Sequence, residues 1–138
     1  MKTTRALALL MTALFTTGLA STAGTAHSAA TPAVPGTALR LTVAHGATPT
    51  TGTPHLATLQ CPPGSSTSHP DPLTACRLLD SVNGDLARLD VDPGACTQEY
   101  DPYTVTAAGT YRGRPLSFQQ TYGNHCVLLR TAGAFFDF

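Results

Sequence analysis

The chain has 138 residues, eight basic and eight acidic side chains and a mean hydropathy of +0.03, which suits about one globular domain. Beyond residue 30 it holds six arginines, no lysine and eight acidic residues, so six minus eight gives a net charge of −2. That balance argues against nucleic acid as a partner, because phosphates attract basic surfaces.

The N-terminal segment has the order of a secretory signal. Lys2 and Arg5 precede a short apolar run, and small residues continue to Ala30. The run is shorter than the roughly 20 apolar residues that cross a bilayer, so we expect no membrane anchor. We predict a signal peptide over 1–30, a flexible leader over 31–37, and a secreted, extracellular domain over 38–138.

All the cysteines lie in the predicted domain: Cys61, Cys76, Cys96 and Cys126. An even number in an exported chain favours disulfides, and four cysteines allow three pairings. A zinc site is the weaker interpretation, because no C-x-x-C spacing is present. We expect no metal and no cofactor.

The first half of the domain predicts two strands and a helix. Apolar and polar residues alternate over 38–43 and over 55–60, and a Thr/Pro/Gly-rich loop separates these segments. Asp71 suits a helix cap and Pro72 a first helical position. Apolar residues then recur at helical spacing to about Leu89, while Asn83-Gly84 leaves open a break.

The second half predicts more strands. The segment 96–102 is expected to be extended but outside the sheet, because it ends in Asp101-Pro102. Strands are expected at 103–107 and 116–122 around hairpin turn signals, then at 127–129 and 134–138. The expected fold is α+β: an antiparallel sheet of about five strands with a helix on one face.

Catalytic motifs are missing from the sequence. It contains no Gly-x-Ser-x-Gly, His-Glu-x-x-His, P-loop or Gly-x-Gly-x-x-Gly pattern. The histidines are scattered through predicted loops. A small secreted hydrolase built on His69 or His125 is therefore the weakest hypothesis, and we expect that the protein is not an enzyme.

The segment that begins at Cys96 suggests a binding loop. It is polar at its tip, tied by a disulfide at its start and stiffened by Asp101-Pro102 at its end. Proteases bind extended backbone, and a loop already held in that shape binds with little ordering cost. A loop that cannot open after attack also re-forms its bond readily. Many anchored loops bind nothing, so this pattern alone is weak.

A set of short motifs across residues 38–138 is specific when taken together. The motifs are Leu41-Thr42-Val43 with Gly46, Cys61-x-Pro-Gly64, His69-Pro70 with Ala75-Cys76, Gly84-Asp85-Leu86, Cys96-x-x-x-Tyr100-Asp101-Pro102, the Gly109–Gly113 hairpin, Asn124-x-Cys126 and Phe136-x-Phe138. With cysteine spacings of 15 and 30 residues, they resemble the Streptomyces subtilisin inhibitor family.

The resemblance implies a fold and an assembly. It implies the bridges Cys61–Cys76 and Cys96–Cys126. It also implies a five-stranded antiparallel sheet packed on two helices, and a homodimer formed through the outer face of the sheet. The implied partner is an extracellular subtilisin-like serine protease, which the chain would inhibit.

The resemblance also implies a reactive bond between Gln98 and Glu99, with Gln98 entering the protease's specificity pocket. Ala95 and Cys96 would pair with an edge strand of the protease. The remaining implied loop residues are Thr97, Tyr100 and Asp101 as protease contacts, and Pro102 and Asn124 as supports.

The chain departs from the family at the reactive bond. Family members often carry Met or Lys at the pocket position after a Pro, whereas here Thr97 precedes Gln98. An uncharged Gln makes no ion pair in an acidic, trypsin-like pocket but fits a broad, mostly apolar one. Glu99 brings a charge that costs free energy unless the enzyme offers a cation. The alternative function is therefore a non-inhibitory or retargeted relative, cut as a substrate or bound to another secreted protein.

Overall fold

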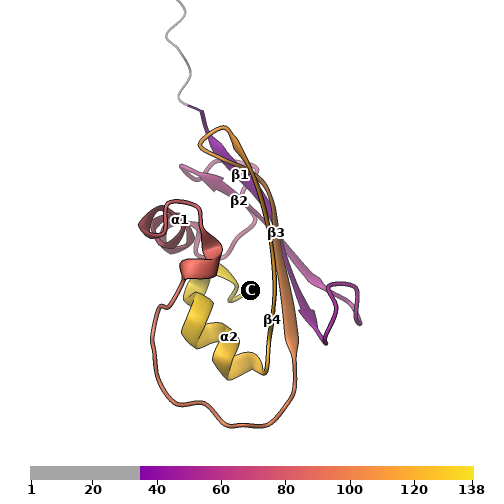
Figure 1. Cartoon of the computed structure of the whole chain (residues 1–138). Helices are drawn as coiled ribbons and strands as arrows, with labels where there is room; N and C mark the ends of the chain where they lie inside the picture. Colours follow the sequence, from indigo (N-terminus) through magenta and orange to yellow (C-terminus); the bar gives the residue numbers. More distant parts are fainter. Residues whose placement is uncertain (1–34) are drawn as a thin grey trace, which may run out of the picture. The chain divides into compact units, whose positions relative to one another are not determined.

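The fold is built on one antiparallel sheet, seen nearly edge-on in Figure 1. The computed structural model describes residues 35–138, so the predicted signal peptide and most of the predicted leader lie outside the described residues. The strands are β1 (Thr37–His45), β2 (His55–Cys61), β3 (Tyr103–Tyr111) and β4 (Arg114–Tyr122), in the order β2-β1-β3-β4. The central strands are thus β1 and β3.

One face of the sheet carries the core. In β1, Leu39, Leu41 and Val43 are buried while Ala38 and Arg40 are exposed, the alternation expected of a half-buried strand. The helices α1 (Pro72–Ser81) and α2 (His125–Ala132) both lie on the buried side of the sheet (Figure 1). Full burial of each large apolar side chain contributes about 1.5–3 kcal/mol.

The first helix begins where the sequence predicts and ends earlier. The Asp71 carboxylate accepts a hydrogen bond from the Thr74 amide (3.2 Å), and Pro72 occupies the first turn. The hydrogen bond to Thr74 lowers the pKa of Asp71. The helix stops at Ser81, and a short 3₁₀ turn, η1 (Leu86–Arg88), continues the apolar pattern.

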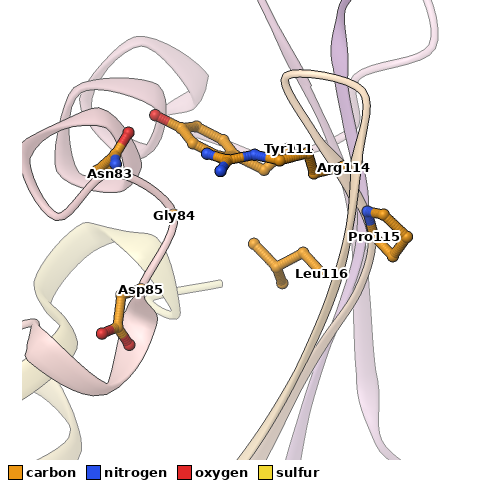
Figure 2. Close-up of a pocket in the computed structure, with 7 residues that line it drawn as sticks. All are labelled: Asn83, Gly84, Asp85, Tyr111, Arg114, Pro115 and Leu116. Atoms are coloured by element: carbon orange, nitrogen blue, oxygen red, sulfur yellow. The ribbon is translucent and has the colours of Figure 1, made fainter.

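The break between α1 and η1 has a steric cause at Gly84. Asn83 and Gly84 have positive φ angles of 52° and 82°, which end a right-handed helix. A Cβ on Gly84 would lie 2.5 Å from Tyr111 Cδ1, so only glycine fits. Figure 2 shows Tyr111 reaching from the β3–β4 hairpin toward this turn, where its hydroxyl donates to Asp80 (2.9 Å). The break left open by the sequence is therefore present.

The C-terminal part differs from the sequence prediction. The strand expected at 127–129 lies inside α2, and the one expected at 134–138 is a 3₁₀ turn, η2 (Gly133–Phe135), followed by coil. The count of five strands is therefore wrong, since four strands form the sheet within residues 35–138. A short apolar run does not distinguish strand from buried helix. Here Leu128 and Ala132, four residues apart, are both fully buried, as one helix face requires.

Both predicted disulfides are present, and the α+β class with two helices is confirmed. Cys61–Cys76 links β2 to α1, with Cα atoms 5.7 Å apart. Cys96–Cys126 links the segment before β3 to the first turn of α2, with Cα atoms 5.8 Å apart. Neither helix of residues 35–138 has the length and apolarity to span a membrane.

Candidate functional site

The candidate site is the long exposed segment between η1 and β3. Residues 89–102 form no helix or strand, and in Figure 1 they swing around the lower end of the molecule past α2. We refer to residues 95–102 as the binding loop. Tyr100 in this loop is 75% exposed, which is unusual for so large a side chain and leaves it free to contact a partner.

The N-terminal arm of the binding loop is fixed to α2. The Cys96–Cys126 bridge makes the covalent link. Just before the loop, the Arg130 guanidinium donates to the Asp92 carboxylate (3.1 Å), and the Asp92 amide donates to the Arg130 carbonyl (2.9 Å). Gly94 lies so close to this guanidinium that a Cβ would fall 2.0 Å from Nη1. The arm is therefore held along the whole length of the helix.

The centre of the binding loop is held by one buried side chain, Asn124. Its Nδ2 donates to the carbonyl of Thr97 (2.9 Å) and to that of Glu99 (3.0 Å). Its Oδ1 accepts from the Val127 amide (3.0 Å) and so caps α2. Because that bond fixes Oδ1 toward the helix, the amide group must face the loop.

The two carbonyls held by Asn124 belong to the residues on either side of Gln98. Thr97, Gln98 and Glu99 are all exposed, and none of them belongs to a helix or strand. The main chain on both sides of Gln98 is thus fixed to the scaffold, while Gln98 itself remains open to solvent.

The C-terminal arm of the binding loop is fixed to the sheet end. The Asp101 amide donates to the Gly123 carbonyl (2.9 Å), and the Gly46 amide donates to the Pro102 carbonyl (2.6 Å). His45 Nε2 lies 2.5 Å from Asp101 Oδ1, and the His45 ring stacks on Tyr103. The Pro102 carbonyl is thus bonded to the scaffold, and Asp101 binds the scaffold through both its amide and its carboxylate.

An open hollow of about 440 Å³ lies between the loop and α2, and Cys96, Gln98 and Val127 are among the residues that line it. A second hollow of about 310 Å³, shown in Figure 2, lies beside Asn83 and the start of β4. The second one is at the hairpin end of β3, whereas the binding loop joins the opposite end of that strand. It is therefore separate from the candidate site.

The two histidines considered for catalysis do not meet in a catalytic group. His69 is buried, with Nε2 3.3 Å from the Phe135 carbonyl and Nδ1 accepting from the Asp71 amide. Both of its ring nitrogens therefore bond to backbone. His125 packs against Tyr103, with ring centroids 4.9 Å apart.

Sequence reasoning missed three contributors to the site: His45, Tyr103 and Arg130. Their partners are distant in sequence, for example 56 residues between His45 and Asp101 and 38 between Arg130 and Asp92. A pattern within one segment of the sequence does not predict a contact between residues so far apart. The helical spacing of Leu128 and Ala132 could have placed Arg130 on α2, and so beside the segment that Cys126 tethers.

Comparisons with known proteins agree with this architecture. Residues 35–124 match the family described as subtilisin inhibitor-like. The chain is 39% identical over 136 residues to a subtilase-type protease inhibitor of Streptomyces fradiae, a match that covers 92% of this chain and 96% of the relative. It is 40% identical over 123 residues to the trypsin inhibitor STI2 of Streptomyces longisporus, covering 86% of this chain and 85% of the relative.

A solved structure is similar as well. Streptomyces caespitosus sermetstatin, crystallised in complex with Bacillus licheniformis subtilisin, superposes with a TM-score of 0.61 at 31% sequence identity, covering 75% of this chain and 99% of that one. The fold and the site define a small disulfide-linked protein that presents an exposed loop held to the scaffold at both arms and at its centre. The matches identify the particular family: the chain belongs to the subtilisin inhibitor-like family.

Proposed function

We propose that the chain is a secreted inhibitor of subtilisin-like serine endopeptidases, with Gln98–Glu99 as its reactive bond. The observation that carries this proposal is the Asn124 amide, which bonds to the carbonyls on both sides of Gln98. A protease binds a substrate as an extended strand, and here the scaffold already holds the main chain on both sides of Gln98. Little ordering entropy is then lost on binding, which favours a tight complex.

The proposed mechanism is substrate-like. The protease serine attacks the carbonyl carbon of Gln98, and the enzyme's oxyanion hole stabilises the charge that develops on the carbonyl oxygen. Ala95 and Cys96 pair with the enzyme's edge strand, while Thr97 and Tyr100 make further contacts on the two sides of the bond. Because both arms are held by the scaffold, the two ends stay together after cleavage and the bond re-forms.

The exposed residues at the bond support a second candidate, a retargeted or non-inhibitory relative. Neither Gln98 nor Glu99 makes an ion pair or a side-chain hydrogen bond to the scaffold within residues 35–138. These side chains can therefore change without loss of the loop's supports. The relatives named above include both a subtilase-type inhibitor and a trypsin inhibitor, so relatives of this chain carry the names of different targets.

An inhibition titration separates the two candidates. Purified protein is added to active-site-titrated subtilisin, and residual activity and the mass of the inhibitor are followed over time. An inhibitor reduces activity near equimolar dose and stays largely intact, whereas a substrate is cut quickly and completely at Gln98–Glu99. A Gln98→Gly variant is the matched control, because it removes the pocket side chain and leaves the Asn124 bonds to Thr97 and Glu99 possible. Weaker inhibition by this variant is expected, and unchanged inhibition would contradict the role of Gln98.

Homodimer formation through the outer face of the sheet is part of the proposal. On this face Leu56 of β2 is 65% exposed, and Thr42 of β1 lies beside it in the register. An exposed leucine on an unpartnered sheet face supports contact with a second copy. Sedimentation of the wild type and of Leu56→Asp tests this: the wild type should sediment as a dimer and the variant as a monomer.

Secretion is proposed from the predicted signal peptide over 1–30 and from the two disulfides, which form in oxidising compartments. N-terminal sequencing of protein recovered from the culture medium tests it. A start within residues 21–31 supports the proposal, and retention of Met1 contradicts it.

A further inference from the structure

The C-terminal arm of the binding loop is held by the last residue of β1. His45 Nε2 lies 2.5 Å from Asp101 Oδ1, in a pair whose side chains are 61% and 55% exposed. The next residue, Gly46, donates its amide to the Pro102 carbonyl (2.6 Å). The last residue of β1 and the residue that follows it thus hold two consecutive residues of the loop, just beyond the proposed reactive bond.

The orientation of the His45 ring is set by its neighbours. It stacks on Tyr103 with ring centroids 4.6 Å apart and planes at 13°. Tyr103 also contacts His125, with centroids 4.9 Å apart. The Thr104 hydroxyl donates to the Gly46 carbonyl (2.8 Å) and fixes the backbone that carries the imidazole. The ring is therefore presented to Asp101 by the folded sheet rather than by chance surface pairing.

We propose that His45 is a positioning residue that holds the leaving-group side of the reactive bond, an inference that rests on the proposed function. When the protease serine Oγ bonds to the Gln98 carbonyl carbon, the bond to the Glu99 nitrogen breaks and that nitrogen takes up a proton as an amine. Resynthesis is the reverse: the amine attacks the acyl ester, and the proton returns to the serine oxygen. Water attacking the same ester instead releases cleaved inhibitor.

Whether the amine or water attacks the acyl ester depends on how close the amine stays to that ester. The Glu99 amine is two residues from Asp101, so fixing Asp101 keeps the amine close to the ester and raises its effective concentration. Asn124 holds the Glu99 carbonyl as well, and His45 adds the restraint on the far side. Loss of this restraint shifts the balance toward hydrolysis.

The groups that face His45 are the Asp101 carboxylate, the Tyr103 ring, His125 beyond that ring, and His55, which lines the same hollow. Within residues 35–138, Asp101 is the only one of them that hydrogen-bonds to the His45 side chain. The restraint that His45 places on the loop therefore depends on this one contact.

The test compares His45→Gln with wild type, and uses His55→Gln as the matched control because that histidine makes no hydrogen bond to the loop. Each protein is incubated with subtilisin at one fixed pH, and the ratio of cleaved to intact inhibitor at equilibrium is measured by mass spectrometry. Loss of an exposed contact of this kind predicts a rise of about 1.5- to fivefold in that ratio for His45→Gln. The His55→Gln ratio should match wild type.

A cleaved-to-intact ratio for His45→Gln equal to that of the wild type would overturn the positioning role while leaving inhibition itself established. If the wild type does not inhibit, the proposed function fails, and amide hydrogen exchange in the free protein still tests the restraint. Exchange of the Asp101 and Gly46 amides should be about 1.5- to fivefold faster in His45→Gln than in the wild type. Equal exchange in the two proteins would reject the restraint by His45.

Discussion

The side chain of Asn124 offers the sharpest test of how the scaffold supports the binding loop. It makes two kinds of bond: Oδ1 caps α2 through the Val127 amide, and Nδ2 holds the carbonyls of Thr97 and Glu99. Asn124→Ser keeps a good helix cap but is too short to reach the loop. The substitution therefore separates the loop contacts from the contribution of the cap to stability.

The magnitude follows from the bonds lost. Two hydrogen bonds, each with a net value of about 0.5–1.5 kcal/mol, correspond to about 1–3 kcal/mol, or roughly 5- to 150-fold in the inhibition constant. The melting temperature should fall as well, because the free protein loses the same two bonds, but by less than in a variant that also removes the cap at Val127. The cleaved fraction in the complex should also rise, because the Glu99 side of the bond is less restrained.

Two measurements check this prediction: the inhibition constant against subtilisin, and the thermal unfolding midpoint of the free protein. Asn124→Asp is the companion variant, because it keeps the capping oxygen but turns a carboxylate oxygen toward the two carbonyls. It should weaken inhibition at least as much as Asn124→Ser. If the serine variant inhibits within twofold of the wild type, the Asn124 bonds do not organise the loop for binding and the reasoning above is wrong.

Three further changes test other parts of the argument. Gln98→Lys should tighten inhibition of trypsin-like enzymes, because a pocket carboxylate gains a partner; an unchanged trypsin inhibition constant would remove Gln98 from the pocket. Replacing Cys96 and Cys126 together by Ser should lower the unfolding free energy by about 3–4 kcal/mol and turn the chain into a substrate, as measured by denaturant titration and mass spectrometry. Burial, then the hydrogen bond to Asp80, raises the pKa of Tyr111 above its ordinary value of 10.0, so stability present below about pH 10 should fall as pH rises further. Tyr111→Phe should flatten that slope in unfolding measurements, and an identical slope would contradict the assignment.

The first two-thirds of the fold could be predicted from local patterns, because those patterns have one physical interpretation. Strict alternation gave β1 and β2, and Asp71-Pro72 gave the start of α1. The last part could not be predicted in the same way. Val127-Leu128-Leu129 is compatible with either a strand or a buried helix, and the deciding fact is tertiary: Leu128 and Ala132 both pack into the core.

The candidate site could likewise be predicted from the sequence only in part. The loop, its cysteine and its rigid end could be inferred from the order Cys96 to Pro102, and the role of Asn124 came only from the family resemblance. The contacts of His45 with Asp101 and of Arg130 with Asp92 join residues 56 and 38 positions apart. They exist because strand ends and helix faces bring distant residues together, which the pattern within any one segment does not encode.

The two acidic residues of the binding loop differ in what they contact. Asp101 pairs with His45, and Asp92, just before the loop, pairs with Arg130, so these carboxylates fix the two arms. Within residues 35–138, Glu99 makes no ion pair, although its carbonyl is held by Asn124. Its carboxylate is thus the one acidic group of the binding loop that the described scaffold leaves for a partner. Under the proposed function, we expect the scaffold to set how firmly the proposed reactive bond is presented, and Gln98 and Glu99 to set which enzyme accepts it.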